Sequence, residues 1–264
     1  HYIDAFFETV SGFTTTGSTI LREIESLPKG ILFWRALTHW IGGMGVLVFV
    51  MMLTSLEDKN AMHLMRAEVP GPEADKLVPK ARNTAKILYG MYFALTVLEV
   101  IFLLFGKMNL YDSIVHSFST AGTGGFSNWN NSVAHYNSAY IDGVITVFMI
   151  LFGVNFNLYF LLLLKQFKAA FRNEELKAYL GIIAGSIAVI TVNILKIYGN
   201  PLKAFRYASF QVASVITTTG FCTANYDLWP ELSKCILLAI MVIGACAGST
   251  GGGIKVSRLL ILFK

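Results

Sequence analysis

Charged residues are scarce in this sequence of 264 residues: Asp, Glu, Lys and Arg supply only 14% of the chain. An average soluble domain carries about 25%. Apolar residues supply 55%, and several apolar runs are about 20 residues long. A bilayer core about 30 Å thick is crossed by a helix of that length. The composition therefore excludes an ordinary soluble enzyme and predicts a polytopic membrane protein.

Patterns typical of chemistry or nucleic-acid binding are also missing. The three cysteines, Cys222, Cys235 and Cys246, match neither a zinc spacing nor a C-x-x-C redox pair, so we interpret them as small apolar residues. There is no G-x-S-x-G or H-E-x-x-H, and the five His are scattered. The net charge of +5 comes from basic residues that lie between apolar runs, without forming one stripe. We expect no enzyme, no cofactor and no nucleic-acid partner.

Two kinds of apolar segment alternate along the chain. Long stretches that can span a bilayer occupy residues 31–53, 86–105, 140–164, 178–198 and 235–263. Shorter segments at 2–11, 111–119 and 201–216 are predicted to form half-length, re-entrant helices, with Asp112 capping the second and Asn200 followed by Pro201 starting the third. Because the chain begins at His1 without a preceding span, we expect it to be part of a longer protein.

The distribution of Lys and Arg predicts the orientation. Residues 54–85 and 165–177 hold five and four basic residues, whereas 126–139 hold none. Because cytoplasmic loops carry the excess of basic residues, the first two segments are predicted to be cytoplasmic. The short helices and the segments after them then belong to the extracellular half.

A three-fold repeat follows the short helices. Segments SGFTTTGST, STAGTGGFS and SVITTTGFC align without gaps on Gly17, Gly125 and Gly220. Each copy has Ser six positions before the glycine (Ser11, Ser119, Ser214), Thr two before (Thr15, Thr123, Thr218) and a polar residue nine before (Glu8, His116, Gln211). Re-entrant backbone is tolerated in a membrane where it lines a watery cavity, and converging carbonyls replace the hydration shell of a cation. The repeat predicts a cation pore.

The sequence ACAGSTGGGIK at 245–255 interrupts the last span. It is not a fourth copy, because too few residues separate Gly220 from Gly248 to hold two further spans. Three consecutive glycines do not hold a helix. We expect either a loop that gates the pore below the repeated segments or a glycine-rich packing surface between helices.

At these residues the chain closely resembles the Trk/Ktr/HKT superfamily of potassium transporters, in particular its TrkH type. The resemblance covers essentially the whole length, through SGFTTTGST, WRALTHWIGGMG, RAEVPGP, GGFS, TTTGF and GACAGSTGGGIKVSR. It implies an all-α polytopic membrane protein of span, pore helix, filter loop and span units around a pseudo-fourfold pore. It also implies a multi-pass protein of the bacterial cytoplasmic membrane that takes up K⁺ without a cofactor.

The resemblance implies roles for residues and segments. The filter, which is the only metal site expected, would comprise Thr15, Thr16, Gly17, Thr123, Gly124, Gly125, Thr218, Thr219 and Gly220. The gating loop would comprise Gly244, Ala247, Gly248, Ser249, Thr250, Gly251, Gly252 and Gly253. The chain would divide into repeat 1 (1–56), a cytoplasmic loop (57–86), repeat 2 (87–164), a second loop (165–177) and repeat 3 (178–264), with repeat 4 absent.

Partners follow from the same resemblance. It implies a homodimer in the lipid bilayer and a cytoplasmic nucleotide-binding regulatory subunit of the TrkA/KtrA type. This subunit would dock on the loop at 57–86 and near Lys255 and Arg258; alternatively, those charges only set the topology. Glycine at each anchor favours K⁺, since some relatives with serine there pass Na⁺. A Na⁺ or mixed Na⁺/K⁺ transporter and a non-conducting membrane scaffold stay as alternatives.

Polar residues at membrane depth are the remaining candidates. Arg35 lies near the outer end of its span and is interpreted as snorkelling to the interface, while His39 follows one turn later. Asn155 and Asn157 are expected to meet the pore or to hydrogen-bond a neighbouring helix. We expect Glu99 to have a partner on another helix, and His116 to be a packing residue with satisfied nitrogens.

Overall fold

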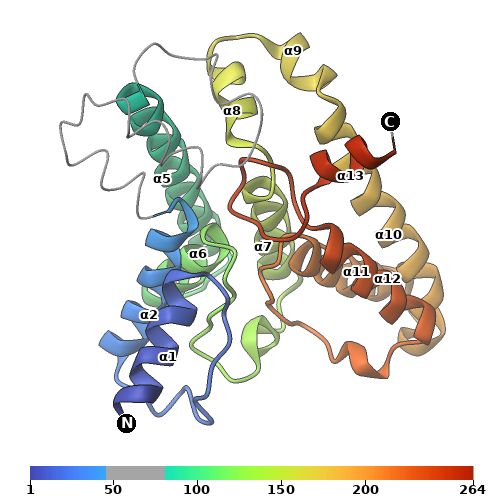
Figure 1. Ribbon diagram of the computed structural model, residues 1–264. Coiled ribbons are helices and arrows are strands. Elements are labelled where there is room, and N and C mark those ends of the chain that lie inside the picture. Colours follow the sequence, from blue (N-terminus) through green and yellow to red (C-terminus); the bar gives the residue numbers. More distant parts are fainter. Residues whose placement is uncertain (46–80, 264) are drawn as a thin grey trace.

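The computed structural model describes residues 1–45 and 81–263, and the side chains of all of these except 81–85. Within those ranges the regular structure is entirely helical, as expected (Figure 1). The predicted docking loop at 57–86 falls largely outside the described residues, as does the motif RAEVPGP. The end of the first apolar stretch, at 46–53, also lies outside them.

The helices fall into the two classes expected from the sequence. Among the described residues, two helices are long and apolar enough to cross a membrane, α5 (Ala81–Phe105) and α10 (Glu174–Tyr198). The three short helices are α1 (Tyr2–Phe13), α6 (Leu110–Ala121) and α11 (Pro201–Ile216). The others are α2 (Lys29–Gly43), α7 (Ala139–Phe152), α8 (Phe156–Leu163), α9 (Phe167–Arg172), α12 (Glu231–Ile243) and α13 (Val256–Leu262), with 3-10 helices at Ser132–Tyr136 and Tyr226–Leu228.

Each short helix packs against the helices that are its neighbours along the chain. α6 lies against α5 and α7, α11 lies against α10 and α12, and α1 lies against α2. Apolar clusters fill these contacts, and one of them joins repeats 2 and 3 through Leu103, Met149 and Phe210. The repeat seen in the sequence is therefore also a repeat of packing.

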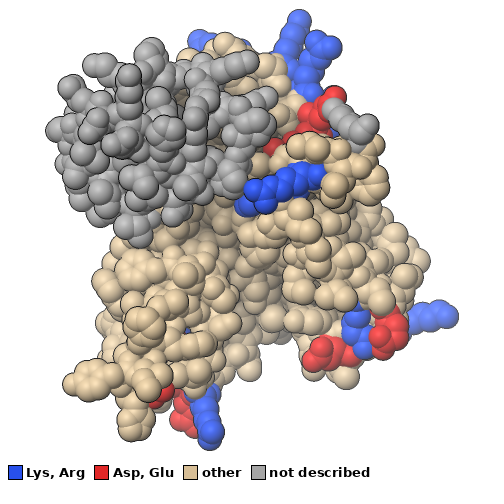
Figure 2. Space-filling view, viewed as in Figure 1, with Lys and Arg blue, Asp and Glu red and all other residues tan. Residues whose placement is uncertain are grey.

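Side chains on the outer face suit a lipid environment. Large apolar residues are exposed along both long helices, for example Phe93 and Phe105 on α5 and Val189 and Val192 on α10. Figure 2 shows Lys, Arg, Asp and Glu gathered toward the two ends of the visible face. The band between the ends is almost free of charge, as a bilayer core requires.

Two sequence-based details of the helices are wrong. The stretch at 140–164 is not one continuous helix, because α7 and α8 are bent by 89° at a break between Phe152 and Phe156. The N-cap of α6 is Asn109, whose side chain accepts a hydrogen bond from the backbone N–H of Asp112. Asn200 and Pro201 start α11 as predicted.

Candidate functional site

The three repeated segments share one unusual backbone conformation. They form no β-sheet, and each is called a strand below because it is an irregular, non-helical segment that follows a short helix. The threonine two positions before the anchor and the anchor glycine itself have positive φ in every copy. The values are 52° and 74° for Thr15 and Gly17, 52° and 79° for Thr123 and Gly125, and 58° and 84° for Thr218 and Gly220. Positive φ is uncommon for threonine. A conformation that recurs at both positions supports the alignment on Gly17, Gly125 and Gly220.

Hydrogen bonds to the helix that precedes each strand repeat as well. The backbone N–H one position before the anchor donates to the carbonyl of the shared serine in all three copies. The pairs are Thr16 to Ser11 (3.0 Å), Gly124 to Ser119 (3.0 Å) and Thr219 to Ser214 (2.9 Å). Each strand therefore turns back onto the C-terminal end of its own short helix.

The shared serines stabilise the outer part of the strands. The hydroxyl of Ser11 donates to the carbonyl of Ser18 (2.6 Å), and that of Ser214 donates to the carbonyl of Phe221 (2.7 Å). These carbonyls lie one position after the anchor glycine. The hydroxyl of Ser119 is buried and makes no hydrogen bond within the part of the chain that the structure describes.

This difference allows a matched prediction. We expect Ser214→Ala to lower the free energy of unfolding by about 1 kcal/mol, because a buried carbonyl loses its donor. Ser119→Ala is expected to leave stability unchanged or slightly raised, since it removes a buried hydroxyl that has no partner. Denaturant unfolding of the purified variants in detergent measures both, and equal losses would contradict the assignment.

A second set of contacts links the polar residue nine before the anchor to the residue two after it. The Glu8 carboxylate accepts hydrogen bonds from the Thr19 hydroxyl (2.6 Å) and the Ile20 N–H (2.9 Å). In the second copy, Nε2 of His116 lies 3.0 Å from the Ser127 hydroxyl. Gln211 and Cys222 occupy these two positions in the third copy. The sequence analysis found the first member of each pair and missed the second, although all three are small residues with a hydroxyl or thiol.

His116 is the packing residue that was expected, because its other nitrogen lies 2.8 Å from the carbonyl of Asp112. The Asp112 carboxylate accepts hydrogen bonds from Asn109, Asn128 and the Tyr136 hydroxyl, each at 2.8 Å. Burial and the adjacent Asp112 carboxylate raise the pKa of Tyr136. Its hydroxyl therefore stays protonated and keeps the first turn of α6 connected to the 3-10 helix at Ser132–Tyr136.

The interpretation of Arg35 as a snorkelling residue is wrong. Its side chain is 5% exposed and forms an ion pair with Glu8, with 3.0 Å between Nε and Oε2. It also donates to the Thr19 hydroxyl (3.2 Å), and its guanidinium lies 4.0 Å from the centre of the Phe126 ring. Arg35 thus connects the first strand to the second.

His39 fills the space behind the second strand. Its ring stacks on Phe126 with 4.0 Å between centroids, and a side chain at Gly124 would overlap it. Deeper in the protein, Glu99 is buried on α5, and neither of its carboxyl oxygens makes a hydrogen bond within the described residues, so the partner expected on another helix is not found there.

The strands contact one another in the order of the sequence. A Cβ atom on Gly17 would overlap the carbonyl of Gly124, and one on Gly125 would overlap the carbonyl of Thr219. The same atom on Gly220 meets nothing within 4 Å among the described residues. The first two anchor glycines therefore face the carbonyl one position before the next anchor. The third, Gly220, faces open space among the described residues.

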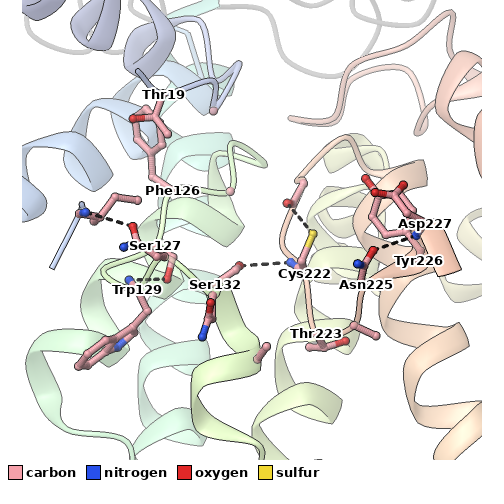
Figure 3. Close-up of a pocket in the computed structure, with 18 of the residues that line it drawn as sticks. Thr19, Phe126, Ser127, Trp129, Ser132, Cys222, Thr223, Asn225, Tyr226 and Asp227 are labelled. Atoms are coloured by element: carbon pink, nitrogen blue, oxygen red, sulfur yellow. Dashed lines mark hydrogen bonds between the residues drawn. The ribbon is translucent and has the colours of Figure 1, made fainter. Parts of the chain in front are cut away.

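A cavity of about 590 Å³ opens above the strands. Its lining includes all three anchor glycines and the residues two positions after them, Thr19, Ser127 and Cys222. Figure 3 shows these residues reaching the cavity from segments far apart in the sequence, together with Trp129, Asn225 and Asp227. The cavity is on the side of the strands that faces residues 129–134 and 222–227.

The glycine-rich segment lies on the opposite side of the strands. Its Gly252 N–H donates to the Thr218 hydroxyl (2.7 Å), and its Thr250 carbonyl accepts from the Thr123 hydroxyl (3.0 Å). Both threonines stand two positions before an anchor glycine. At the ends of the segment, Gly244 and Gly253 have positive φ of 75° and 82° and approach each other so closely that a side chain on either would overlap the other.

The break between α7 and α8 receives this segment. The Cys246 N–H donates to the carbonyl of Gly153 (3.1 Å), and the Phe156 N–H donates to the carbonyl of Gly248 (3.0 Å). Asn155 caps α8 by accepting from the N–H of Asn157 (2.9 Å). The two irregular segments thus satisfy each other's backbone groups; Gly153 and Asn155 were the sequence signals for the break that was missed.

Comparisons with known proteins agree with this geometry. The TrkH family profile, described as a cation transport protein, matches residues 1–264. Two potassium uptake proteins named TrkH are 42% identical (Salmonella typhimurium) and 40% identical (Escherichia coli strain K12) over 265 residues. In each case the match covers 99% of this chain and 55% of the relative.

A solved structure extends the likeness to three dimensions. The crystal structure of the potassium transporter TrkH from Vibrio parahaemolyticus matches with a TM-score of 0.83 and 35% sequence identity. The match covers 100% of this chain and 54% of that chain. The present chain thus spans about half the length of the curated relatives it matches.

Proposed function

Because this chain belongs to the TrkH family of cation transport proteins, we propose that it supplies three walls of a pore for K⁺ uptake. The observation that carries the proposal is the set of three strands with the same positive-φ pattern, arranged in order below one polar cavity. The filter residues would be Thr15, Thr16, Gly17, Thr123, Gly124, Gly125, Thr218, Thr219 and Gly220.

Carbonyl oxygens of these strands would replace the hydration shell of the ion. Positive φ at the anchor glycines turns the peptide groups, and only glycine adopts that conformation without a steric cost. The helices α1, α6 and α11 each end two residues before the positive-φ threonine, at Phe13, Ala121 and Ile216. Their C-terminal ends carry partial negative charge, which favours a cation nearby.

The remaining wall would come from the part of the protein beyond this chain. Gly220 faces open space where Gly17 and Gly125 each face a carbonyl of the next strand. A fourth strand next to Gly220 would complete the ring. The chain would then divide into repeats at 1–56, 87–164 and 178–264, with loops at 57–86 and 165–177.

The glycine-rich segment would act as the gate. It lies against Thr123 and Thr218, at the end of the strands opposite the outer cavity. An ion that leaves the strands there meets the backbone of residues 250–252. Displacement of the gating loop, which comprises Gly244, Ala247, Gly248, Ser249, Thr250, Gly251, Gly252 and Gly253, would open the path.

The partners and location belong to the same proposal. The protein would be a multi-pass homodimer of the bacterial cytoplasmic membrane, controlled by a nucleotide-binding subunit of the TrkA/KtrA type. In Figure 1 the segment α8–α9 and the C-terminal helix α13 lie at the same end of the molecule. Basic residues there, including Lys165, Lys168, Arg172 and Arg258, suit an acidic docking surface.

Rubidium-86 uptake tests the proposed pore. A full-length protein that contains this sequence is expressed in a potassium-transport-deficient bacterium. It is expected to take up rubidium, and K⁺ but not Na⁺ is expected to compete with that uptake. Gly220→Ser is expected to lose at least about tenfold of this discrimination, which corresponds to about 1.4 kcal/mol.

The outcomes separate the alternatives. Na⁺ competition equal to that of K⁺ in the unsubstituted protein would indicate a Na⁺ or mixed transporter. A well-expressed protein that carries no rubidium with its regulatory partner present would indicate a scaffold.

A further inference from the structure

The side chain of Glu175 connects the proposed gating loop to the helix that follows it, α13. Its Oε1 atom accepts a hydrogen bond from the backbone N–H of Ala247 (2.7 Å) and another from that of Ser257 (3.1 Å). One carboxylate oxygen therefore connects Ala247, which is part of the loop, with Ser257, the second residue of α13. Hydrogen bonds to a charged acceptor are stronger than neutral ones.

The chain between these two amides needs such an external contact. It contains four glycines and the positive-φ residue Lys255, so it has many alternative conformations that must be excluded. Within it, the Lys255 ammonium donates to the carbonyl of Gly251. The contacts with Thr123 and Thr218 hold the middle of the loop against the strands, while Glu175 joins the loop at Ala247 to the start of α13.

Glu175 lies where a cytoplasmic event can reach it. It is in the first turn of α10, which follows α9 after the single residue Asn173. α9 belongs to the segment at 165–177, which its four basic residues predict to be cytoplasmic. A shift of the start of α10 would therefore move a hydrogen-bond acceptor that the loop depends on.

We propose that Glu175 is a positioning residue that latches the gating loop beneath the filter, so that a displacement at the start of α10 releases the loop. The inference rests on the proposed function, because it takes the loop at 244–253 as the gate. The proposed latch consists of one oxygen atom, Oε1 of Glu175, and the backbone N–H groups of Ala247 and Ser257. Neither family resemblance nor sequence pattern pointed to Glu175.

The position of the loop can be measured without any ion flux. A cysteine placed at Thr250 in a cysteine-free full-length protein reports its exposure to a membrane-impermeant thiol reagent applied in inside-out vesicles. With Glu175 present, labelling is expected to be slow, because the Thr250 backbone contacts Thr123. In Glu175→Ala the rate is expected to rise at least about tenfold, since both hydrogen bonds to the charged acceptor are lost.

Two variants serve as comparisons. Lys177→Ala removes a charge from an exposed position at the same end of α10 and is expected to label at the rate of the parent. Glu175→Gln keeps an acceptor oxygen at the same distance and is expected to label at an intermediate rate. Folding of each variant is monitored by size-exclusion chromatography and thermal unfolding in detergent.

Rubidium flux in proteoliposomes without any regulatory partner supplies the functional measurement. The basal flux through Glu175→Ala is expected to exceed that of the parent and of Lys177→Ala. A folded Glu175→Ala that labels no faster than the parent would overturn the latch. If labelling rises but neither protein conducts rubidium, the latch stands and the proposed pore function fails.

Discussion

Gly125→Ala is expected to abolish selective rubidium uptake. The added methyl group would overlap the carbonyl of Thr219 in the neighbouring strand, and backbone atoms cannot rotate away as the end of a flexible side chain can. Alanine at a φ of 79° is also strained, at a cost of about 1–2 kcal/mol. The second strand must therefore move relative to the third, and both contribute carbonyls to the same proposed ring.

The measurement is uptake of rubidium-86 with K⁺ and Na⁺ as competitors, at matched protein levels. Gly143→Ala is the control, because Gly143 lies on α7 with nothing within 4 Å of an added Cβ, and alanine favours a helix there. We expect the control to transport normally and Gly125→Ala to fall at least about 100-fold, equivalent to about 2.7 kcal/mol. Undiminished, selective uptake by Gly125→Ala would rule out these strands as the filter.

Glu8→Gln is expected to have the largest effect on stability. The Glu8 side chain is 11% exposed and its partner Arg35 is 5% exposed. Removing one member of such a buried pair costs about 3–5 kcal/mol, because the other charge is left without compensation. Arg35 also lines the outer cavity. Its uncompensated positive charge would repel cations there, so rubidium uptake should fall and the fall should be smaller at high ionic strength.

A double variant separates this charge effect from lost packing. Glu8→Gln combined with Arg35→Gln removes both charges and is expected to recover part of the stability and most of the uptake. Glu231→Gln removes an exposed carboxylate from the start of α12, where the Glu231 side chain is 86% exposed, and is expected to change neither. A double variant as impaired as the sum of the single ones would show that the two residues act independently.

The sequence was most informative where a local rule repeats. Three copies of one pattern predicted the strands, and the structure gives their threonines and glycines the same φ signs. Asn200 with Pro201 predicted the start of α11, because cap chemistry depends only on neighbouring residues. Asp112 was assigned as a cap for the same reason, but Asn109 lies three residues earlier and performs that role.

Contacts between distant segments were out of reach of the same reasoning. The burial of Arg35 depends on Glu8 lying beside it in space, and position along a span does not reveal that. Glu175 contacts residues far along the chain and belongs to no repeat. Gly153 and Asn155 were sequence signals for the break in the third apolar stretch. The backbone groups at the break, however, are paired by residues of a distant loop, and a local signal does not reveal that.

The interlocking of the two irregular segments also constrains biosynthesis. When α7 and α8 enter the membrane, the carbonyl of Gly153 and the N–H of Phe156 have no partners until residues 246–248 have left the ribosome. Unpaired backbone groups are costly in a hydrocarbon environment. We therefore expect the bend to be held by the insertion machinery or by trapped water until the third repeat arrives. A nascent chain that ends after α8 should be recognised by membrane proteases as incomplete, and pulse-chase experiments on chains truncated before and after the loop would measure this difference in lifetime.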